Sequence, residues 1–224
     1  MKIVLIALVC LLGCSMALDL GENFNFLDSH PNFEFVVETS MNGTGYIVEE
    51  LHSLEFNKVR AKLTSYKGDT PAFDMLFDYT EGYMLFYYNL TGACRVLDLE
   101  KKNLKEYYLN ILKDHTEYAG KRGHLHLYEV KQPDLGARSW MYGVLPENNE
   151  QNHGIFLPVR MQVHNPMLHV DYTYEFMDTI NFPKASESDF DYSMCKRAIQ
   201  NREAAPADAS DVKMNILETF LKNL

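Results

Sequence analysis

Cysteine and basic residues are both scarce in this sequence. The 224-residue chain has four cysteines, and its 31 acidic residues outnumber its 21 lysines and arginines, which gives a formal net charge of −10. A surface that binds nucleic acid or an anionic membrane needs a basic patch. The charge balance therefore argues against both classes of partner.

Long apolar runs are also missing after the N-terminus, where no stretch approaches the roughly 18 consecutive apolar residues of a membrane-spanning helix. Residues 1–17 differ from the rest, because Lys2 is followed by an apolar run over residues 3–12 and by small side chains at Ser15 and Ala17. This order is typical of a secretory signal peptide. We therefore expect a secreted, extracellular protein with no transmembrane anchor.

Cysteine becomes scarcer still without the signal peptide, because Cys10 and Cys14 belong to it. The chain then keeps Cys94 and Cys195, and in an oxidising compartment two remaining thiols most simply form a disulfide. Two free or metal-binding thiols are the alternative. Residues 11–14 also resemble a bacterial lipobox, in which Cys14 would carry a lipid.

Motifs that carry catalysis are absent: the sequence has no Gly-x-Ser-x-Gly elbow, His-Glu-x-x-His helix, phosphate-binding glycine loop or dinucleotide fingerprint. We therefore expect no enzyme and no cofactor other than calcium, with a secreted hydrolase as a third alternative. His124 and His126 alternate along a strand, and His164 and His169 flank a turn. Such histidines are ordinarily a polar strand face, and we expect no metal site there.

Calcium is the one metal for which the sequence offers candidate ligands. Glu187, Asp189 and Asp191 form a comb of alternate carboxylates. The comb lacks the glycine and the final glutamate of an EF-hand loop. It predicts weak calcium binding or, alternatively, only a solvated acidic loop.

Two acceptor sequons for N-glycosylation begin at Asn42 and Asn89. Each follows a strand-like run and lies beside a glycine, where an exposed turn is expected. We expect both asparagines to carry a glycan.

Apolar residues recur at the two-residue period of a strand through most of the chain. Residues 73–79 are apolar on one face, and residues 83–88 are apolar or aromatic on both, so the second strand needs cover on each side. Gly82 permits a tight turn between them, and we expect this pair to be the central pair of the sheet. The count is about nine strands without βαβ alternation, which favours a large antiparallel sheet or open barrel. The other predicted strands cover residues 33–39, 45–55, 56–66, 124–130, 139–145, 155–164 and 168–177.

Residues 99–114 break the strand pattern, since Leu104, Tyr108 and Leu112 recur at helical spacing against lysines. The spacing predicts a helix that crosses the sheet, although an alternation beginning at Tyr107 also permits a strand. We expect one domain over residues 18–195. Residues 196–224 form a C-terminal segment that ends in an amphipathic helix from about Ser210, docked on its own domain or on a partner.

Methionine and aromatic residues are abundant, with 11 Met, 13 Phe and 14 Tyr. Thioethers adapt their shape and aromatic rings supply area, so this composition suits a concave sheet face that holds a variable apolar ligand. Ordinary core filling is the alternative. The residues expected to line the pocket are Phe73, Met75, Phe77, Met84, Phe86, Tyr88, Trp140, Tyr142, Met161, Tyr172, Tyr174 and Phe176.

The order of several features between residues 73 and 195 resembles that of the ependymin-related proteins, which are secreted glycoproteins of animals. These features are the turn at Glu81 and Gly82 with a sequon before Cys94, then Trp140 and Gly143 followed by Leu157, Pro158 and Val159, and finally Phe176, Phe190 and Cys195. Family members carry further cysteines, so only a bridge from Cys94 to Cys195 can be inherited here.

The resemblance implies a fold like that of the LolA-type lipoprotein carriers. This fold is mostly β with α: a large curved antiparallel sheet or open half-barrel, with helices covering its mouth over a hydrophobic pocket. The family is associated with apolar ligands, calcium and extracellular matrix.

We therefore expect a secreted, non-enzymatic glycoprotein that binds or carries a lipid or other hydrophobic ligand in a pocket on the concave sheet face. The alternative is an extracellular matrix or signalling glycoprotein with weak calcium binding and no ligand cavity. A contact with an extracellular protein and a homodimer are left open.

Overall fold

The computed structural model describes residues 26–41, 44–65, 71–132, 137–144, 157–165, 170–178 and 180–203. The strands are β1 (Asn32–Met41), β2 (Thr44–Ser53), β3 (Lys58–Ser65), β4 (Pro71–Asp78), β5 (Tyr83–Tyr88), β6 (Ala93–Asp98), β7 (Thr116–Arg122), β8 (Leu125–Gln132), β9 (Ala137–Val144), β10 (Leu157–Asn165) and β11 (Val170–Phe176). The helices are α2 (Phe26–Ser29), α3 (Leu104–Asp114) and α4 (Lys196–Glu203), with short 3-10 turns η2 (Glu187–Phe190) and η3 (Ser193–Cys195). The fold is therefore mostly β, as predicted.

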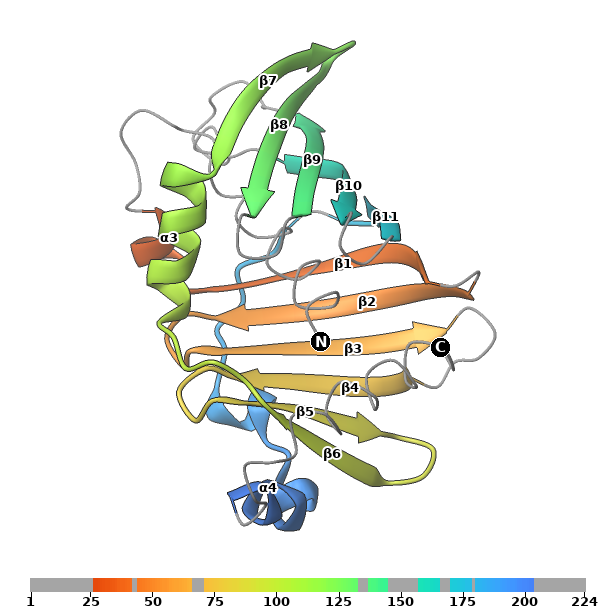
Figure 1. Cartoon of the computed structure of the whole chain (residues 1–224), viewed down its shortest axis with the longest axis vertical. Helices are drawn as coiled ribbons and strands as arrows, with labels where there is room; N and C mark the ends of the chain where they lie inside the picture. The colour runs from red at the N-terminus through yellow and green to blue at the C-terminus, as the bar shows by residue number, and fades with distance from the viewer. Residues whose placement is uncertain are drawn as a thin grey trace.

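All eleven strands belong to one antiparallel sheet, in the order β6-β5-β4-β3-β2-β1-β11-β10-β9-β8-β7 (Figure 1). The sheet is curved and not closed, since β6 and β7 lie at its two edges. Strands that follow each other in the chain pair with each other, except β6 and β7. The chain passes from β6 to β7 through α3, and β11 returns to pair with β1.

The prediction that β4 and β5 form the central pair is wrong. The central strand is β1, which pairs with β2 and β11, whereas β5 is next to the edge. The count of about nine strands missed β6 and β7. Both are edge strands whose side chains are mostly intermediate or exposed, so neither has the alternating apolar pattern that marks a half-buried strand.

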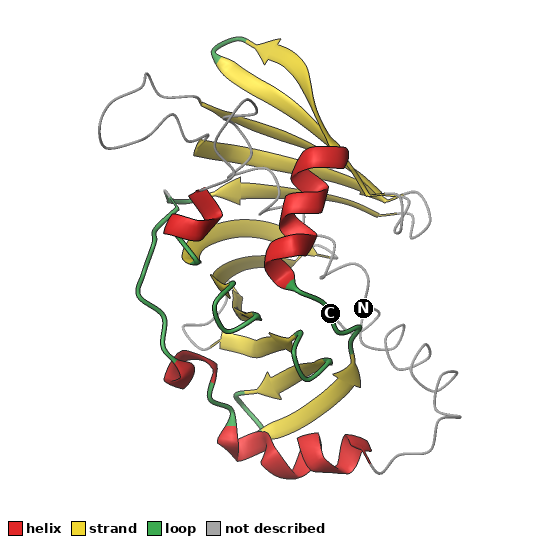
Figure 2. Cartoon of the chain, turned by 90° about the vertical axis from the view of Figure 1, so that its left-hand side faces the viewer, coloured by secondary structure: helices red, strands yellow, loops and turns green. Residues whose placement is uncertain are grey.

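Helix α3 lies in front of the curved sheet (Figure 2). The helical interpretation of residues 99–114 is confirmed, with a start at Leu104, and the strand alternative is wrong. Leu104 and Tyr108 lie one turn apart and are 0% and 1% exposed. The helix therefore packs one face against the sheet; we call the sheet face toward α3 the inner face.

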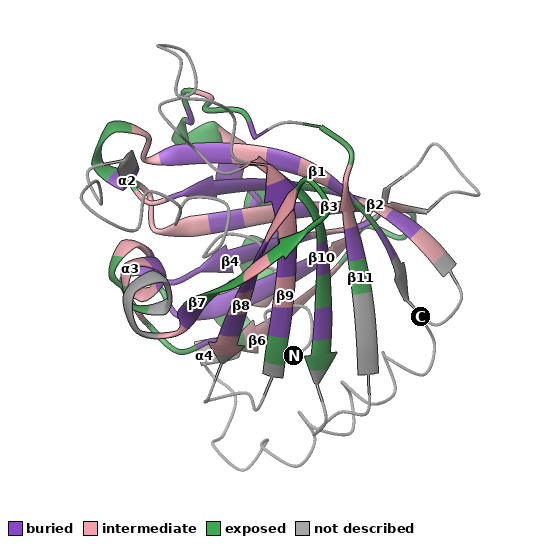
Figure 3. Cartoon of the chain, turned by 90° about the horizontal axis from the view of Figure 1, so that it is seen from above, coloured by how far each residue is buried: buried purple, intermediate pink, exposed green. Residues whose placement is uncertain are grey.

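In the first sheet half, β1 to β6, the inner face is covered and so is part of the outer face. On the inner face, Val59, Ala61 and Leu63 of β3 are at most 1% exposed, as the alternation with basic residues predicts. Strand β5 is buried on both sides: Met84 and Phe86 belong to the inner cluster, and Tyr83 and Leu85 to a second cluster on the outer face. Figure 3 shows how buried and exposed segments alternate along the strands.

Residues 180–203 supply the cover of that outer face. Ala185, Phe190 and Tyr192 join the outer cluster, and the ring of Phe190 lies 5.9 Å from that of Phe56. The Arg60 guanidinium donates a hydrogen bond to the Asp189 carbonyl oxygen at 2.9 Å. This segment is therefore part of the domain and extends it beyond the last strand.

A disulfide joins Cys94 on β6 to Cys195, as predicted. Its second cysteine lies in η3, not in a final core strand, and is fully buried in the outer cluster. The bond spans a sequence separation of 101 residues. It holds the covering segment against the edge of the sheet.

Asn57 fixes the start of α3 to the sheet. It is the one non-glycine residue with a positive φ among those the structure describes, at 56° in the turn between β2 and β3. Its Oδ1 accepts a hydrogen bond from the Leu104 N–H at 2.7 Å, and its Nδ2 donates to the Lys102 carbonyl oxygen at 2.8 Å. A residue far away in sequence thus satisfies two backbone groups at the helix entry.

Loss of the disulfide should destabilise the domain strongly. The chain-entropy estimate for a loop of about 100 residues is about 4.7 kcal/mol. We expect C94A/C195A to lose much of this amount in chemical unfolding, measured by the urea midpoint. A midpoint equal to that of the oxidised wild type would show that the bridge does not hold the segment.

Two substitutions at Asn57 distinguish what its hydrogen bonds contribute to stability from what its positive φ contributes. N57G should lose about 2–3 kcal/mol of unfolding free energy, since three hydrogen bonds of about 1 kcal/mol each disappear, including an exposed one from Nδ2 to Thr80 Oγ1. N57A should lose roughly 1–2 kcal/mol more, because alanine resists a positive φ. Equal stability of both variants would contradict this account of the turn.

Candidate functional site

The inner face carries one continuous cluster of buried side chains beneath α3. It is rich in aromatic rings and sulfur, and four of its methionines come from four different strands. None of the four is more than 1% exposed: Met75, Met84, Met141 and Met161. The fold therefore gathers adaptable thioethers on the face that α3 covers in part.

Nine of the twelve residues predicted to line a pocket lie in this cluster or pack against it. The members are Phe73, Met75, Phe77, Met84, Phe86, Met161 and Tyr174, and the packed neighbours are Tyr88 and Phe176. Their gathering is a feature of the structure, whereas their role in binding stays a prediction.

The structure places Trp140 and Tyr142 on the outer face, against the prediction. Met141 lies opposite Met161 in the β9–β10 register and joins the inner cluster. Because side chains alternate along a strand, both neighbours of Met141 project to the other side. The side chain of Tyr172 lies outside the described residues.

A polar group of three side chains, which the sequence did not predict, lies within this apolar cluster. Glu50 and His52 are inward-facing residues of β2, and Tyr108 comes from α3. His52 Nε2 is 2.9 Å from Glu50 Oε2, and His52 Nδ1 is 3.1 Å from the Tyr108 hydroxyl. Their exposures are 3%, 0% and 1%, so the network is shielded from bulk solvent.

Aromatic rings enclose the imidazole of this network. The Phe33 ring stacks on His52 at 5.0 Å between centroids, and the Phe35 ring at 5.4 Å. Two flat apolar faces thus hold the histidine in one plane, with both nitrogens directed at partners. The Tyr108 hydroxyl of α3 is therefore hydrogen-bonded to an imidazole whose orientation is fixed.

Burial shifts the pKa values of the three titratable groups in this network. It raises the pKa of the Glu50 carboxyl and lowers the pKa of the His52 imidazole. Burial also raises the pKa of the Tyr108 hydroxyl, with smaller contributions from Tyr79 and Glu50. The raised pKa of the carboxyl and the lowered pKa of the imidazole both favour a neutral pair, in which one proton is shared between the two hydrogen-bonded groups.

One signal in the sequence could have pointed to this network. Tyr46, Val48, Glu50 and His52 share one face of β2, and two titratable side chains at successive inward positions are unusual in an apolar strand face. Their partner Tyr108 is 56 residues from His52, and only the fold brings it there.

The other histidines do not gather. His124 lies exposed in the β7–β8 turn, His126 is on the inner side of β8, and His164 is exposed on β10. His169 lies outside the described residues. Within the described ranges, no group of three His, Cys, Asp or Glu side chains could hold a metal ion.

The acidic comb lies in and after η2. Asp189 accepts hydrogen bonds from the Ser186 N–H and hydroxyl, each at 2.8 Å, and these bonds lower its pKa. Asp191 accepts one from the Ser193 N–H at 2.8 Å. Both carboxylates therefore cap turns, and their use for calcium, together with that of Glu187, stays a prediction.

Asn89 lies in the turn between β5 and β6 at the edge of the sheet. The next residue, Leu90, is 80% exposed, and the Asn89 amide donates a hydrogen bond to Asp74 Oδ1 at 3.2 Å. Asn42 and the signal peptide over residues 1–17 lie outside the described residues, as does the helix predicted from Ser210. Among the helices that are described, none is long and apolar enough to cross a membrane.

The chain matches no protein-family model and no curated protein. Several solved structures are similar to it at low TM-scores. An uncharacterized conserved protein from Thermus thermophilus has a TM-score of 0.46 and 7% identity, over 72% of this chain and 84% of that one.

Two further solved structures belong to named groups. A DUF1329 family protein from Desulfovibrio piger has a TM-score of 0.40 and 13% identity, over 78% of this chain and 95% of that one. A LolA superfamily protein from Nitrosomonas europaea has a TM-score of 0.39 and 11% identity, over 72% and 90%. At these values the likeness supports no conclusion about a ligand or a role.

The Glu50–His52 pair should give stability a recognisable pH dependence. Above about pH 6.5 the unfolded chain holds no proton on either group, whereas the folded pair holds one, so stability should fall by up to about 1.4 kcal/mol per pH unit. Between about pH 4.3 and 6.5 the opposite slopes of the raised glutamate and the lowered histidine cancel. Below this window, stability should fall again.

The variant E50Q removes the glutamate and with it the decline above about pH 6.5. Urea midpoints from pH 6 to 8.5, followed by the fluorescence of the single tryptophan, measure the difference from wild type. Parallel curves for E50Q and wild type would show that the pair holds no extra proton in the folded state.

Proposed function

We propose that this protein is a secreted glycoprotein that carries a lipid or another hydrophobic ligand between its inner sheet face and α3. One observation carries the proposal: an inner face rich in methionine and aromatic side chains packs against the helix α3, which connects the two edges of the sheet. Thioether side chains repack at low cost, so such a face can accept ligands of different shapes.

Helix α3 is the element whose movement would admit a ligand. Its start is fixed by Asn57, and Asn103 Oδ1 accepts a hydrogen bond from the Glu106 N–H at 3.1 Å. Further along, its buried contacts include Leu104 and Tyr108. The far end of α3 leads directly into β7, where the Lys131 N–H donates to the His115 carbonyl oxygen at 2.8 Å, so in this proposal the helix moves outward between two fixed ends.

The buried network gives the site a polar end. If α3 moves outward, Tyr108 leaves His52, and Nδ1 becomes free to bond a polar head group of the ligand. Apolar pockets commonly fix the orientation of a ligand through a few such groups. Because the network is shielded from bulk solvent and holds its proton, we assign it a binding role and no catalytic role.

Secretion and glycosylation are also part of the proposed function. A disulfide between the two cysteines outside the signal peptide supports an oxidising environment. The exposed turn that follows Asn89 supports use of that sequon. Membership of the ependymin-related proteins is proposed on the sequence resemblance alone.

Ligand content and binding test this function directly. We expect organic extraction of the protein from a eukaryotic secretion host to release an apolar molecule, identified by mass spectrometry, and the stripped protein to bind a fluorescent fatty acid. Y108F removes one hydrogen bond of about 1 kcal/mol, so association should become about fivefold faster. An empty extract together with no binding would refute the proposal.

Y192F is the matched control for this test. Its hydroxyl donates to Asp74 Oδ2 at 3.4 Å on the outer face, so the variant also removes one buried tyrosine hydroxyl. We expect its association rate to equal that of wild type. An equal acceleration in Y192F would mean that general loosening, not movement of α3, admits the ligand.

A second candidate is an extracellular matrix or signalling glycoprotein with a filled core. The tight packing of the inner cluster, whose members are at most 8% exposed, favours it. This candidate predicts an empty extract and a calorimetric signal for weak calcium binding that D189N/D191N removes.

A further inference from the structure

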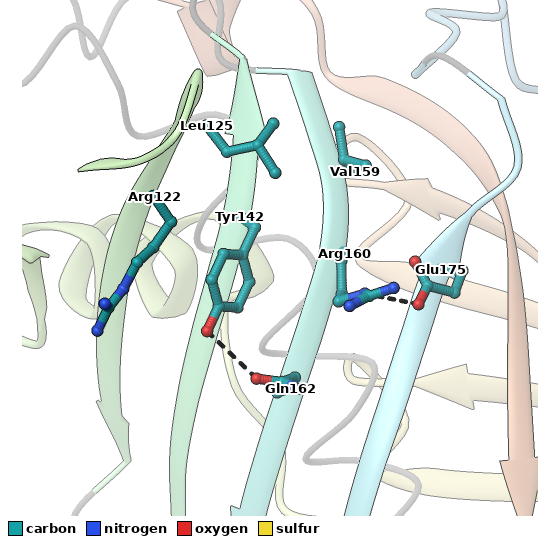
Figure 4. A pocket seen from close by; sticks show the side chains of 7 residues that line it. All are labelled: Arg122, Leu125, Tyr142, Val159, Arg160, Gln162 and Glu175. Carbon is teal, nitrogen blue, oxygen red and sulfur yellow. Dashed lines mark hydrogen bonds and ion pairs between the residues drawn. The ribbon is translucent and has the colours of Figure 1, made fainter. Parts of the chain in front are cut away.

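A pocket lies on the outer face of the other sheet half, β7 to β11, away from the inner cluster (Figure 4). Its volume is about 500 Å³, which suits a small organic molecule. Every strand of this half contributes: the lining residues are Arg122, Leu125, Tyr142, Val159, Arg160, Gln162 and Glu175.

A β-bulge shapes this pocket. The β9–β10 register shifts between Pro158 and Arg160, so Val159 is an extra residue on β10. Proline lacks the N–H that a regular ladder needs, and bulges are where interior strands accommodate it. The irregularity lets two consecutive residues, Val159 and Arg160, line the same pocket.

The two arginines of the pocket differ in their surroundings. Arg160 Nε donates to Glu175 Oε1 at 2.6 Å, so a carboxylate neutralises it. Arg122 forms no ion pair with any residue that the structure describes. The pocket therefore has one positive charge in excess, within a chain of formal net charge −10.

Polar and apolar groups in the pocket are arranged side by side. The Arg122 side chain lies alongside the ring of Tyr142, whose hydroxyl donates to Gln162 Oε1 at 3.2 Å (Figure 4). Leu125 and Val159 lie at the other end of the view, and Val159 is 40% exposed. An anion would therefore meet Arg122 while an apolar body rests on Leu125 and Val159.

We infer that this outer pocket binds a small monocarboxylic acid with an apolar or aromatic body. The planar Arg122 guanidinium would bond the carboxylate through two N–H groups, as arginine does with this anion. Glu175 limits the site to one negative charge, because it holds Arg160 and repels a second carboxylate. The site is distinct from the inner cluster, and its existence does not depend on the proposed carrier function.

Calorimetry with 4-phenylbutanoate tests the inference on the full glycoprotein. We expect the acid to bind and the neutral amide, 4-phenylbutanamide, to bind at least about tenfold more weakly, since a charge-assisted bond is lost. Trp140, the only tryptophan of the chain, lies on the same face, opposite Gln162, and its fluorescence should change on binding. Equal binding of acid and amide, or no binding of the acid, would overturn the inference.

Variants locate the site. R122A should weaken binding of the acid about tenfold or more, and R122K should retain part of it. Arg122 is exposed on an edge strand, so both variants should keep the wild-type circular dichroism spectrum. E175Q should tighten binding severalfold, because it frees the charge of Arg160; weaker binding in E175Q would contradict the assignment.

The matched control is R138A. Arg138 is an exposed arginine on β9 that faces Glu129 at 3.9 Å and does not line the pocket. We expect R138A to bind 4-phenylbutanoate as wild type does. If R138A and R122A weaken binding equally, the effect comes from the net charge of the protein and the pocket is not the site.

Discussion

The chain must pass from one edge of an open sheet to the other. β6 and β7 are consecutive strands, yet nine strands lie between them in the sheet order, so their connection has to span the width of the sheet. Helix α3 makes this crossing and covers the apolar cluster on its way. The inner face is thus covered in part by α3, together with Leu27 of α2, and the carrier function that we propose uses α3.

Different interactions hold α3 on the inner face and the covering segment, residues 180–203, on the outer face. Asn57 bonds the entry of α3 to the β2–β3 turn, and Tyr108 bonds the helix to His52 within the cluster. On the outer face, the disulfide fixes the covering segment to β6. The first sheet half is therefore packed on its inner face and on part of its outer face, whereas the outer face of the second half bears the pocket with Arg122.

Much of this fold could be predicted from the sequence, because burial imposes a two-residue period on interior strands. Strand β5 reveals its double cover through apolar side chains on both faces. Edge strands lack this signal, as β6 and β7 show. The orientation of β9 was also beyond the sequence, since Trp140 and Met141 are both large and apolar, and only the pairing of Met141 with Met161 shows which one faces inward. The polar network could not be predicted because its third member, Tyr108, is 56 residues from His52 in sequence and only the fold brings the two side chains together.

Hydrogen exchange along α3 tests most directly whether this helix is a movable cover. The amides in the second half of α3 should exchange through a local opening, at a free energy well below that of β2 and β4. Bound ligand should change the protection of α3 and leave those strands unchanged. If the amides of α3 exchange only together with β2 and β4, the helix is a fixed part of the core and the account of a carrier is wrong.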